Sequence, residues 1–220
     1  MKKMLFSLVL TGSFLTAIAQ TPTKKTDTPA VAPAEKVESL ASNIKFNPDE
    51  KVITQHLTTI KGQKVPYQAT TGTMPVWDED GKTIAGIFYT YYERSDVNDR
   101  ANRPLVISFN GGPGSASVWM QIAYTGPTLL NIDDEGYPVQ PYGVKQNPYS
   151  ILDVADIVFV NPVNTAYSRM TNKETPKSTF FGVNADVKYL AEWIKTFVTR
   201  NNRWASPKYL IGESYGTTRV

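Results

Sequence analysis

A serine near the end of the sequence lies in a pattern that makes serine a nucleophile. Residues 209–216 read Tyr-Leu-Ile-Gly-Glu-Ser-Tyr-Gly, an apolar run followed by Gly-x-Ser-x-Gly around Ser214. In this pattern a strand turns sharply into a helix and exposes the serine hydroxyl at the top of a sheet. Gly212 and Gly216 are needed because a side chain at either position would collide across the turn. The pattern predicts that Ser214 is the nucleophile of a covalent mechanism.

The alternative for Ser214 is a serine at an ordinary strand end, and the buried strand expected before it argues against that. A serine hydroxyl is a poor nucleophile unless a nearby base takes its proton. In hydrolases with this elbow, the acid and the histidine follow the serine in chain order. The one histidine of the sequence, His56, precedes it. We therefore expect an N-terminal fragment of a longer enzyme, with His56 as a surface or edge-strand residue.

A glycine-rich segment follows another apolar run. Residues 109–117 read Phe-Asn-Gly-Gly-Pro-Gly-Ser-Ala-Ser. A turn of this kind between a strand and a helix exposes backbone N–H groups, which suit an anion such as the oxygen of a tetrahedral acyl intermediate. A phosphate or dinucleotide loop is the competing interpretation, but the segment has neither Gly-x-Gly-x-x-Gly spacing nor a Walker lysine. The segment is predicted to be the oxyanion hole that serves the serine.

Short apolar runs are expected to form the strands that position these two segments. Three of them, predicted to be parallel and buried on both faces, are residues 104–109, 156–160 and 208–211. Earlier strand-like runs are residues 56–69, 74–77 and 84–92, separated by turn signals at Lys61-Gly62 and Asp80-Gly81. The run at 84–92 is expected to pair antiparallel with the strand before it.

Helical spacing indicates the remaining elements. Apolar residues recur on one helical face over residues 183–198, where a crossover helix belongs, and a shorter helix is expected over 118–124. The order of elements predicts an α/β-hydrolase fold: a mostly parallel sheet with an antiparallel start and helices on both faces, truncated after the nucleophile elbow.

The first 43 residues are expected to lie outside the folded domain. Two lysines precede an apolar stretch that ends in an Ala-x-Ala cleavage pattern at residues 17–19. This pattern predicts a bacterial secretory signal peptide over residues 1–19, with an uncleaved anchor as the alternative, and a periplasmic or secreted protein. Residues 20–43, rich in Thr, Pro, Ala and Lys, are predicted to be a disordered linker. The hydrolase domain then covers residues 44–220.

Composition excludes several classes of function. The 23 Lys and Arg residues against 20 Asp and Glu give a net charge of +3, which argues against a nucleic-acid-binding protein. The absence of cysteine excludes disulfides and thiolate metal sites. The acidic run at residues 133–136 lacks the other spaced ligands of a calcium loop, so we expect a solvated turn there. No metal or organic cofactor is expected, and no later segment is apolar enough to form a stable membrane span.

Four motifs in a fixed order resemble the serine carboxypeptidases. They are N-G-G-P-G-S at 110–115, N-P-Y-S at 147–150, N-P-V at 161–163 with a nearby Tyr-Ser, and G-E-S-Y-G at 212–216. The resemblance runs from about Ile84 to the last residue. It implies an α/β hydrolase that removes C-terminal residues from peptides with a free C-terminus, using a Ser-Asp-His triad.

The resemblance also implies a role for individual positions. Ser214 matches the nucleophile, and the backbone N–H groups of Gly112 and Tyr215 match the oxyanion hole. A third set matches the groups that hold the terminal carboxylate of the substrate: Asn110, the backbone of Gly111, and Glu213.

Glu213 is an unusual receptor for a carboxylate. Two ionised carboxylates repel, so Glu213 must be protonated to donate a hydrogen bond to the substrate. We therefore expect the full-length enzyme to prefer acidic pH for peptide substrates. A second role as an acid at a helix N-terminus, favoured by the helix dipole, is compatible with the first.

Two departures from the family pattern bear on substrate preference. Ser108 stands where the family usually carries Trp, and Tyr124 stands where a Glu often precedes a Gly-Pro pair. Two other functions stay open at this point. One is a different α/β hydrolase, such as an esterase or an aminopeptidase. The other is a non-catalytic secreted binding protein that has the same fold.

Overall fold

The sheet begins with an antiparallel meander. The computed structural model describes residues 45–220, so the predictions for residues 1–43 lie outside the described residues. Strands β1 (Glu50–Ile60), β2 (Gln63–Trp77) and β3 (Thr83–Arg94) pair in sequence, each antiparallel to the one before. The two turn signals fall between them. The predicted antiparallel start is therefore confirmed.

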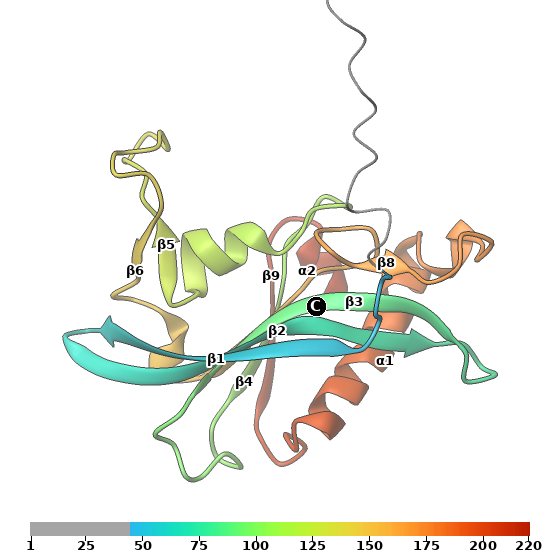
Figure 1. The fold of residues 1–220 in the computed structure, drawn as a ribbon, viewed down its shortest axis with the longest axis horizontal. Helices are drawn as coiled ribbons and strands as arrows, with labels where there is room; N and C mark the ends of the chain where they lie inside the picture. Colours follow the sequence, from blue (N-terminus) through green and yellow to red (C-terminus); the bar gives the residue numbers. More distant parts are fainter. Residues whose placement is uncertain (1–44) are drawn as a thin grey trace, which may run out of the picture. The chain divides into compact units, whose positions relative to one another are not determined.

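The other half of the sheet is parallel. Strands β4 (Leu105–Phe109) and β9 (Lys208–Gly212) run parallel to each other, and β7 (Asp156–Val160) runs parallel to β4 on its other side. The described strands follow the order β1-β2-β3-β7-β4-β9, and the short β8 (Arg169–Met170) pairs with β3 (Figure 1). The carboxyl ends of β4, β7 and β9 consequently meet at one edge of the sheet.

Burial differs among the three parallel strands. Every residue of β4 and β7 is buried, as predicted. In β9 the side chains of Tyr209 and Leu210 are 58% and 40% exposed. The prediction of burial on both faces is therefore wrong for β9. The physical reason is its position: within residues 45–220 β9 is the edge strand, and no described strand pairs with its outer side.

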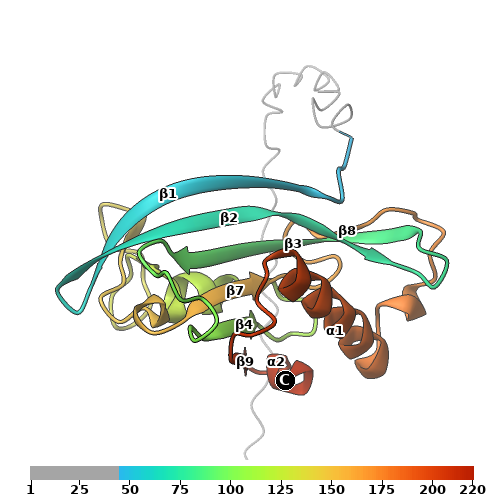
Figure 2. The ribbon, with the colours of Figure 1, turned by 90° about the horizontal axis from the view of Figure 1, so that it is seen from below.

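Helices lie on both faces of the sheet (Figure 2). The predicted crossover helix is α1 (Val183–Arg200), which buries Trp193 and Phe197 against one face. On the other face the short helix η2 (Met120–Thr125) packs Met120 with side chains of β4 and β7. These two apolar layers form the core that fixes the parallel strands.

Shorter elements connect these layers. They are the hairpin of β5 (Thr128–Leu130) and β6 (Val144–Gln146), the turns η3 (Ile151–Asp153) and η4 (Lys177–Thr179), and α2 (Gly216–Arg219), which follows β9. Among residues 45–220, no helix has both the length and the apolar character that crossing a bilayer requires.

Candidate active site

Ser214 lies in a strained turn between β9 and α2. Its backbone φ is 54°, in the left-handed region that non-glycine residues rarely adopt. A Cβ placed on Gly212 would lie 2.3 Å from the backbone carbonyl of Gly216, and one on Gly216 would lie 2.7 Å from the carbonyl oxygen of Phe109. The close approach of these backbones requires glycine at both positions, and the turn leaves Ser214 exposed.

The glycine-rich segment lies directly against this turn. A Cβ placed on Gly111 would lie 2.6 Å from the amide nitrogen of Tyr215 and 2.7 Å from Cβ of Ser214. The Glu213 N–H donates a hydrogen bond of 3.2 Å to the carbonyl oxygen of Phe109. Two segments about a hundred residues apart in the sequence are thus in contact, because β4 and β9 are neighbouring parallel strands.

The two amides predicted to form the oxyanion hole are free to donate. Within residues 45–220, the N–H groups of Gly112 and Tyr215 make no hydrogen bond to the protein. Gly112 has a φ of 106°, which glycine tolerates and other residues do not. Unused amides beside an exposed serine are what an oxyanion needs, since donors that are already paired would have to break those bonds first.

The residues predicted to hold a carboxylate are also brought together. The side-chain amide of Asn110 donates a hydrogen bond of 3.1 Å to Oε2 of Glu213. Gly111 follows Asn110 and lies against the backbone of Glu213. All six predicted site residues therefore lie within one contiguous patch at the carboxyl ends of β4 and β9.

Two polar residues that sequence reasoning assigned no role hold the glycine-rich segment in place. The Ser117 hydroxyl accepts a hydrogen bond of 3.1 Å from the Asn110 N–H and donates one of 2.5 Å to the carbonyl oxygen of Val160. The Ser117 N–H donates 2.8 Å to Oδ1 of Asn161. Asn161 is the first residue of the N-P-V motif, so this motif was the sequence signal that could have identified it. Its side chain hydrogen-bonds the glycine-rich segment to the end of β7.

His56 lies far from this patch. It lies on β1, at the opposite edge of the described sheet from β9. Strands β2, β3, β7 and β4 lie between them. Its Nε2 is 2.6 Å from the Thr54 hydroxyl, and its ring stacks on Tyr67. His56 is therefore not in a position to take a proton from Ser214, in line with the expectation of an edge-strand histidine.

The two departures from the family pattern lie in different surroundings. Ser108 is fully buried within β4, and its hydroxyl has no hydrogen-bond partner among the described residues. It is therefore out of reach of a substrate. Tyr124 is exposed, and its carbonyl oxygen accepts a hydrogen bond of 3.1 Å from the side chain of Asn147.

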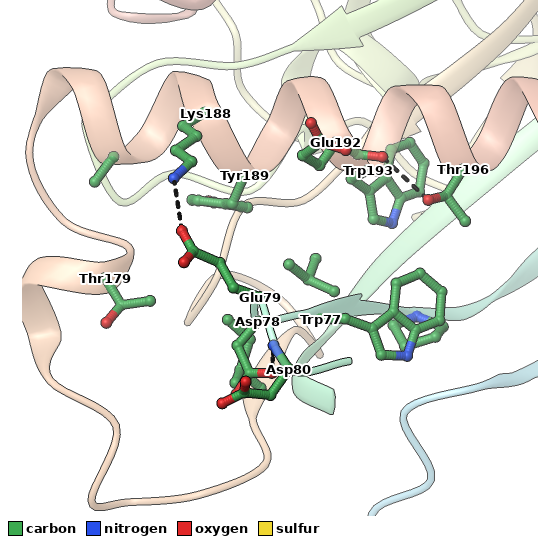
Figure 3. A pocket seen from close by; sticks show the side chains of 14 residues that line it. Trp77, Asp78, Glu79, Asp80, Thr179, Lys188, Tyr189, Glu192, Trp193 and Thr196 are labelled. Carbon is green, nitrogen blue, oxygen red and sulfur yellow. Dashed lines mark hydrogen bonds and ion pairs between the residues drawn. The ribbon is translucent and has the colours of Figure 1, made fainter. Parts of the chain in front are cut away.

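A cavity of about 630 Å³ lies elsewhere, between α1 and the turn that joins β2 to β3 (Figure 3). Its wall includes Trp77, Trp193 and the pair formed by Lys188 and Glu79, whose charged atoms are 3.9 Å apart. None of the six predicted site residues lines it. Among residues 45–220 no cluster of His, Asp and Glu has the arrangement of a metal site.

The strand order, the elbow at Ser214 and the loop packed against it define an α/β hydrolase. The solved structure of Kex1(delta)p, a prohormone-processing carboxypeptidase from Saccharomyces cerevisiae, has the same fold. It aligns with a TM-score of 0.53 over 67% of this chain and 31% of that chain, at 24% sequence identity.

The family follows from the sequence comparison. The family described as serine carboxypeptidase matches residues 60–220, and the chain belongs to that family. Two relatives from Arabidopsis thaliana, serine carboxypeptidase-like 12 and serine carboxypeptidase-like 16, are 26% and 29% identical over 176 residues, or 78% of this chain. The chain spans 38% of the length of each of these two relatives.

Proposed function

We propose that the protein is a serine-type carboxypeptidase in which Ser214 attacks the last peptide carbonyl of a substrate. The observation that carries this proposal is the contact between Gly111 and the Ser214 turn. A Cβ placed on Gly111 would lie only 2.6 Å from the amide nitrogen of Tyr215 and 2.7 Å from Cβ of Ser214. This contact brings the glycine-rich segment, which contains the unused amide of Gly112, against the turn that carries Ser214 and Tyr215. We assign these two amides as the donors that stabilise the oxyanion, and neither has to break a hydrogen bond to the described residues first.

The reaction proceeds in two steps. Ser214 forms an acyl-enzyme and the C-terminal amino acid leaves; water then hydrolyses the acyl-enzyme, and a histidine carries the proton in both steps. His56 is unsuited to that role by its place on β1. We therefore propose that the triad Asp and His are supplied by a part of the full-length protein outside residues 1–220, and that residues 20–220 alone do not turn over substrate.

Recognition of the free C-terminus is assigned to three groups. We assign the binding of a terminal carboxylate to the Asn110 side chain, the Gly111 N–H and the side chain of Glu213, which lie together at the elbow. This set favours an exopeptidase over an esterase or an aminopeptidase, since neither of those needs to bind a carboxylate on the leaving group. The substrates proposed are peptides with a free C-terminus, and residues 1–19 suggest that the enzyme acts outside the cytoplasm.

The test uses the full-length protein with its triad. An N-blocked peptide with a free C-terminus is incubated with the enzyme, and the released amino acid is identified by mass spectrometry. Successive residues are expected to leave from the C-terminus, and Ser214→Ala is expected to remove at least about 10⁴-fold of the rate. Residues 20–220 serve as a second control and are expected to be inactive.

The same experiment separates the alternative functions. Release of residues from the N-terminus of a peptide whose C-terminus is blocked would identify an aminopeptidase, and turnover of simple esters alone would identify an esterase. Turnover by residues 20–220 that disappears in Ser214→Ala would show that the triad partners lie within this chain. A folded full-length protein that binds peptides without cleaving them would support the non-catalytic binding protein.

A further inference from the structure

A buried arginine contacts the candidate site from the interior of the protein. The side chain of Arg219, in α2, is 2% exposed. Its Nη1 donates a hydrogen bond of 2.6 Å to the backbone carbonyl oxygen of Asn110, and its Nε donates one of 2.8 Å to Oδ2 of Asp186 in α1. One side chain therefore joins the glycine-rich segment, the elbow helix and the crossover helix.

The hydrogen bond from Arg219 to the carbonyl oxygen of Asn110 affects the orientation of the next amide in the chain. The carbonyl of Asn110 and the N–H of Gly111 belong to one peptide unit, which is planar and trans, so the two groups point in opposite directions. Fixing the oxygen on Arg219 fixes the direction of the Gly111 N–H. That N–H makes no hydrogen bond to the described residues, and it is one of the groups proposed to hold the substrate carboxylate. A cationic donor on the oxygen also polarises the peptide and strengthens its N–H as a donor.

The arginine is itself held from two sides. Asp186 accepts a hydrogen bond of 3.0 Å from the Tyr189 hydroxyl, which in turn accepts one of 3.1 Å from the Val163 N–H beyond β7. Burial, and then the charge of Asp186, raise the pKa of Tyr189, so its hydroxyl stays protonated and keeps donating. The guanidinium carbon of Arg219 lies 4.9 Å from the ring centroid of Tyr215. A guanidinium with two bonds and a stacked face has little freedom to rotate.

We propose that Arg219 is a positioning residue for substrate specificity. By holding the Asn110 carbonyl, it aims the Gly111 N–H at the terminal carboxylate and so sets the preference for substrates that carry one. Asp186 supports this role by fixing the guanidinium. This inference rests on the proposed carboxypeptidase function and adds to it a residue that does not touch the substrate.

The experiment compares two substrates in the full-length enzyme. One is an N-blocked dipeptide with a free carboxylate. The other is the methyl ester of the N-blocked first residue, whose leaving group has no carboxylate. Rates are divided by the amount of reactive serine, titrated with a fluorophosphonate probe. For Arg219→Met, kcat/KM for the dipeptide is expected to fall about 10- to 100-fold, mainly through KM, while that for the ester changes about twofold or less.

Three further variants complete the design. Arg219→Lys keeps the charge and one donor, and is expected to recover part of the dipeptide activity. Asp186→Asn keeps the shape but frees the guanidinium, and is expected to shift the ratio between substrates in the same direction by a smaller factor. The matched control is Arg200→Met, because Arg200 pairs with Asp49 at a partly exposed surface and should leave the ratio unchanged.

The outcomes separate this inference from the function on which it rests. A wild-type enzyme with no preference for the free carboxylate overturns the proposed function and the inference together. A wild-type preference that Arg219→Met and Arg219→Lys both retain, with equal losses on the two substrates, overturns the inference alone. If Arg219→Met does not fold, Arg219→Lys and Asp186→Asn decide: an unchanged ratio in both rejects the proposal, and a shifted ratio in either supports it.

Discussion

The two ends of the parallel strands use buried polar groups in opposite ways. At the amino end, Asp156 opens β7 and is fully buried. Its Oδ1 accepts hydrogen bonds from the Arg103 side chain at 2.7 Å and the Arg94 N–H at 2.9 Å, and its Oδ2 accepts one of 2.7 Å from Arg203. Both oxygens are occupied, and Arg203 also donates to the Tyr91 hydroxyl at 2.6 Å.

At the carboxyl end, the polar groups are left partly unused. Ser214 is exposed and held at a φ of 54°. Within the described residues, the amides of Gly112 and Tyr215 have no acceptor. Arg219, which contacts the loop from the protein interior, is by contrast buried and paired.

The difference separates a structural network from a candidate functional one. A buried network that satisfies every group stabilises one conformation and has nothing left with which to bind a ligand. A strained residue beside unpaired donors is stabilised by its surroundings and gains its partners only when a substrate arrives. Substitutions at the amino end should therefore change stability, whereas substitutions at the carboxyl end should change activity.

The largest effect on stability is expected at Asp156. Asp156→Asn leaves two buried arginines without a charged partner and should lower the free energy of unfolding by about 3–5 kcal/mol. The measurement is urea unfolding of the full-length protein. Asp49→Asn is the control, because its pair with Arg200 is partly exposed and is expected to contribute less than about 1 kcal/mol. Equal losses in the two variants would contradict the role assigned to the Asp156 network.

The next effect is expected at Gly111. A methyl group there collides with the backbone of Tyr215 and must push the loop away from the serine. Gly111→Ala should lower kcat/KM about 100-fold, measured per folded molecule. Gly62→Ala, in the turn between β1 and β2 at a φ of 80°, is the reverse control: it should cost about 1 kcal/mol of stability and leave activity unchanged. An active Gly111→Ala enzyme would break the comparison between the two ends.

The contrast between the two ends also shows what the sequence could predict. The Ser214 turn and the glycine-rich segment are each a single short run of sequence whose chemistry is set by local backbone geometry. The spacing of residues within each run was therefore enough to predict them. Their contact followed from reading two apolar runs as parallel strands. The α1 helix was likewise predictable, because its apolar stripe lies within one segment.

The supporting groups could not be predicted in the same way. Asp156, Arg103 and Arg203 come from three separate segments, and nothing in the spacing of charged residues shows that they meet. Arg219 is a single arginine after the elbow, with no pattern to mark it. The exposure of β9 was missed because an apolar run predicts a strand but not whether a neighbouring element covers it.

A smaller effect is expected from Glu213. If this residue must be protonated to bind a substrate carboxylate, Glu213→Gln supplies the donor at every pH. The variant should lose the acidic preference for peptides with a free C-terminus. At neutral pH its kcat/KM for these peptides should be about tenfold higher than that of the wild type. The pH profile for an ester without the carboxylate is the internal control. Unchanged profiles for both substrates would remove Glu213 from carboxylate recognition.

The smallest effect concerns alkaline pH and involves one tyrosine from each network. Burial and nearby carboxylates raise the pKa of Tyr91 and of Tyr189 above the ordinary value of 10.0. Because the folded-state pKa is the higher one, the stabilisation is complete below about pH 10 and is lost as the pH rises above it. Tyr91→Phe and Tyr189→Phe should each make unfolding less steeply dependent on pH in that window. If the free energy of unfolding depends equally on pH in both variants and in the wild type, the burial of these hydroxyls is contradicted.

The most direct test of the account is a crystal structure of the full-length protein after reaction with a peptidyl phosphonate. We expect the phosphorus to be bonded to the Ser214 hydroxyl oxygen, with one phosphonate oxygen about 2.7–3.1 Å from the amide nitrogens of Gly112 and Tyr215. Attachment to another residue, or a phosphonate oxygen directed away from both amides, would contradict the central claim that this loop and this turn form one catalytic site.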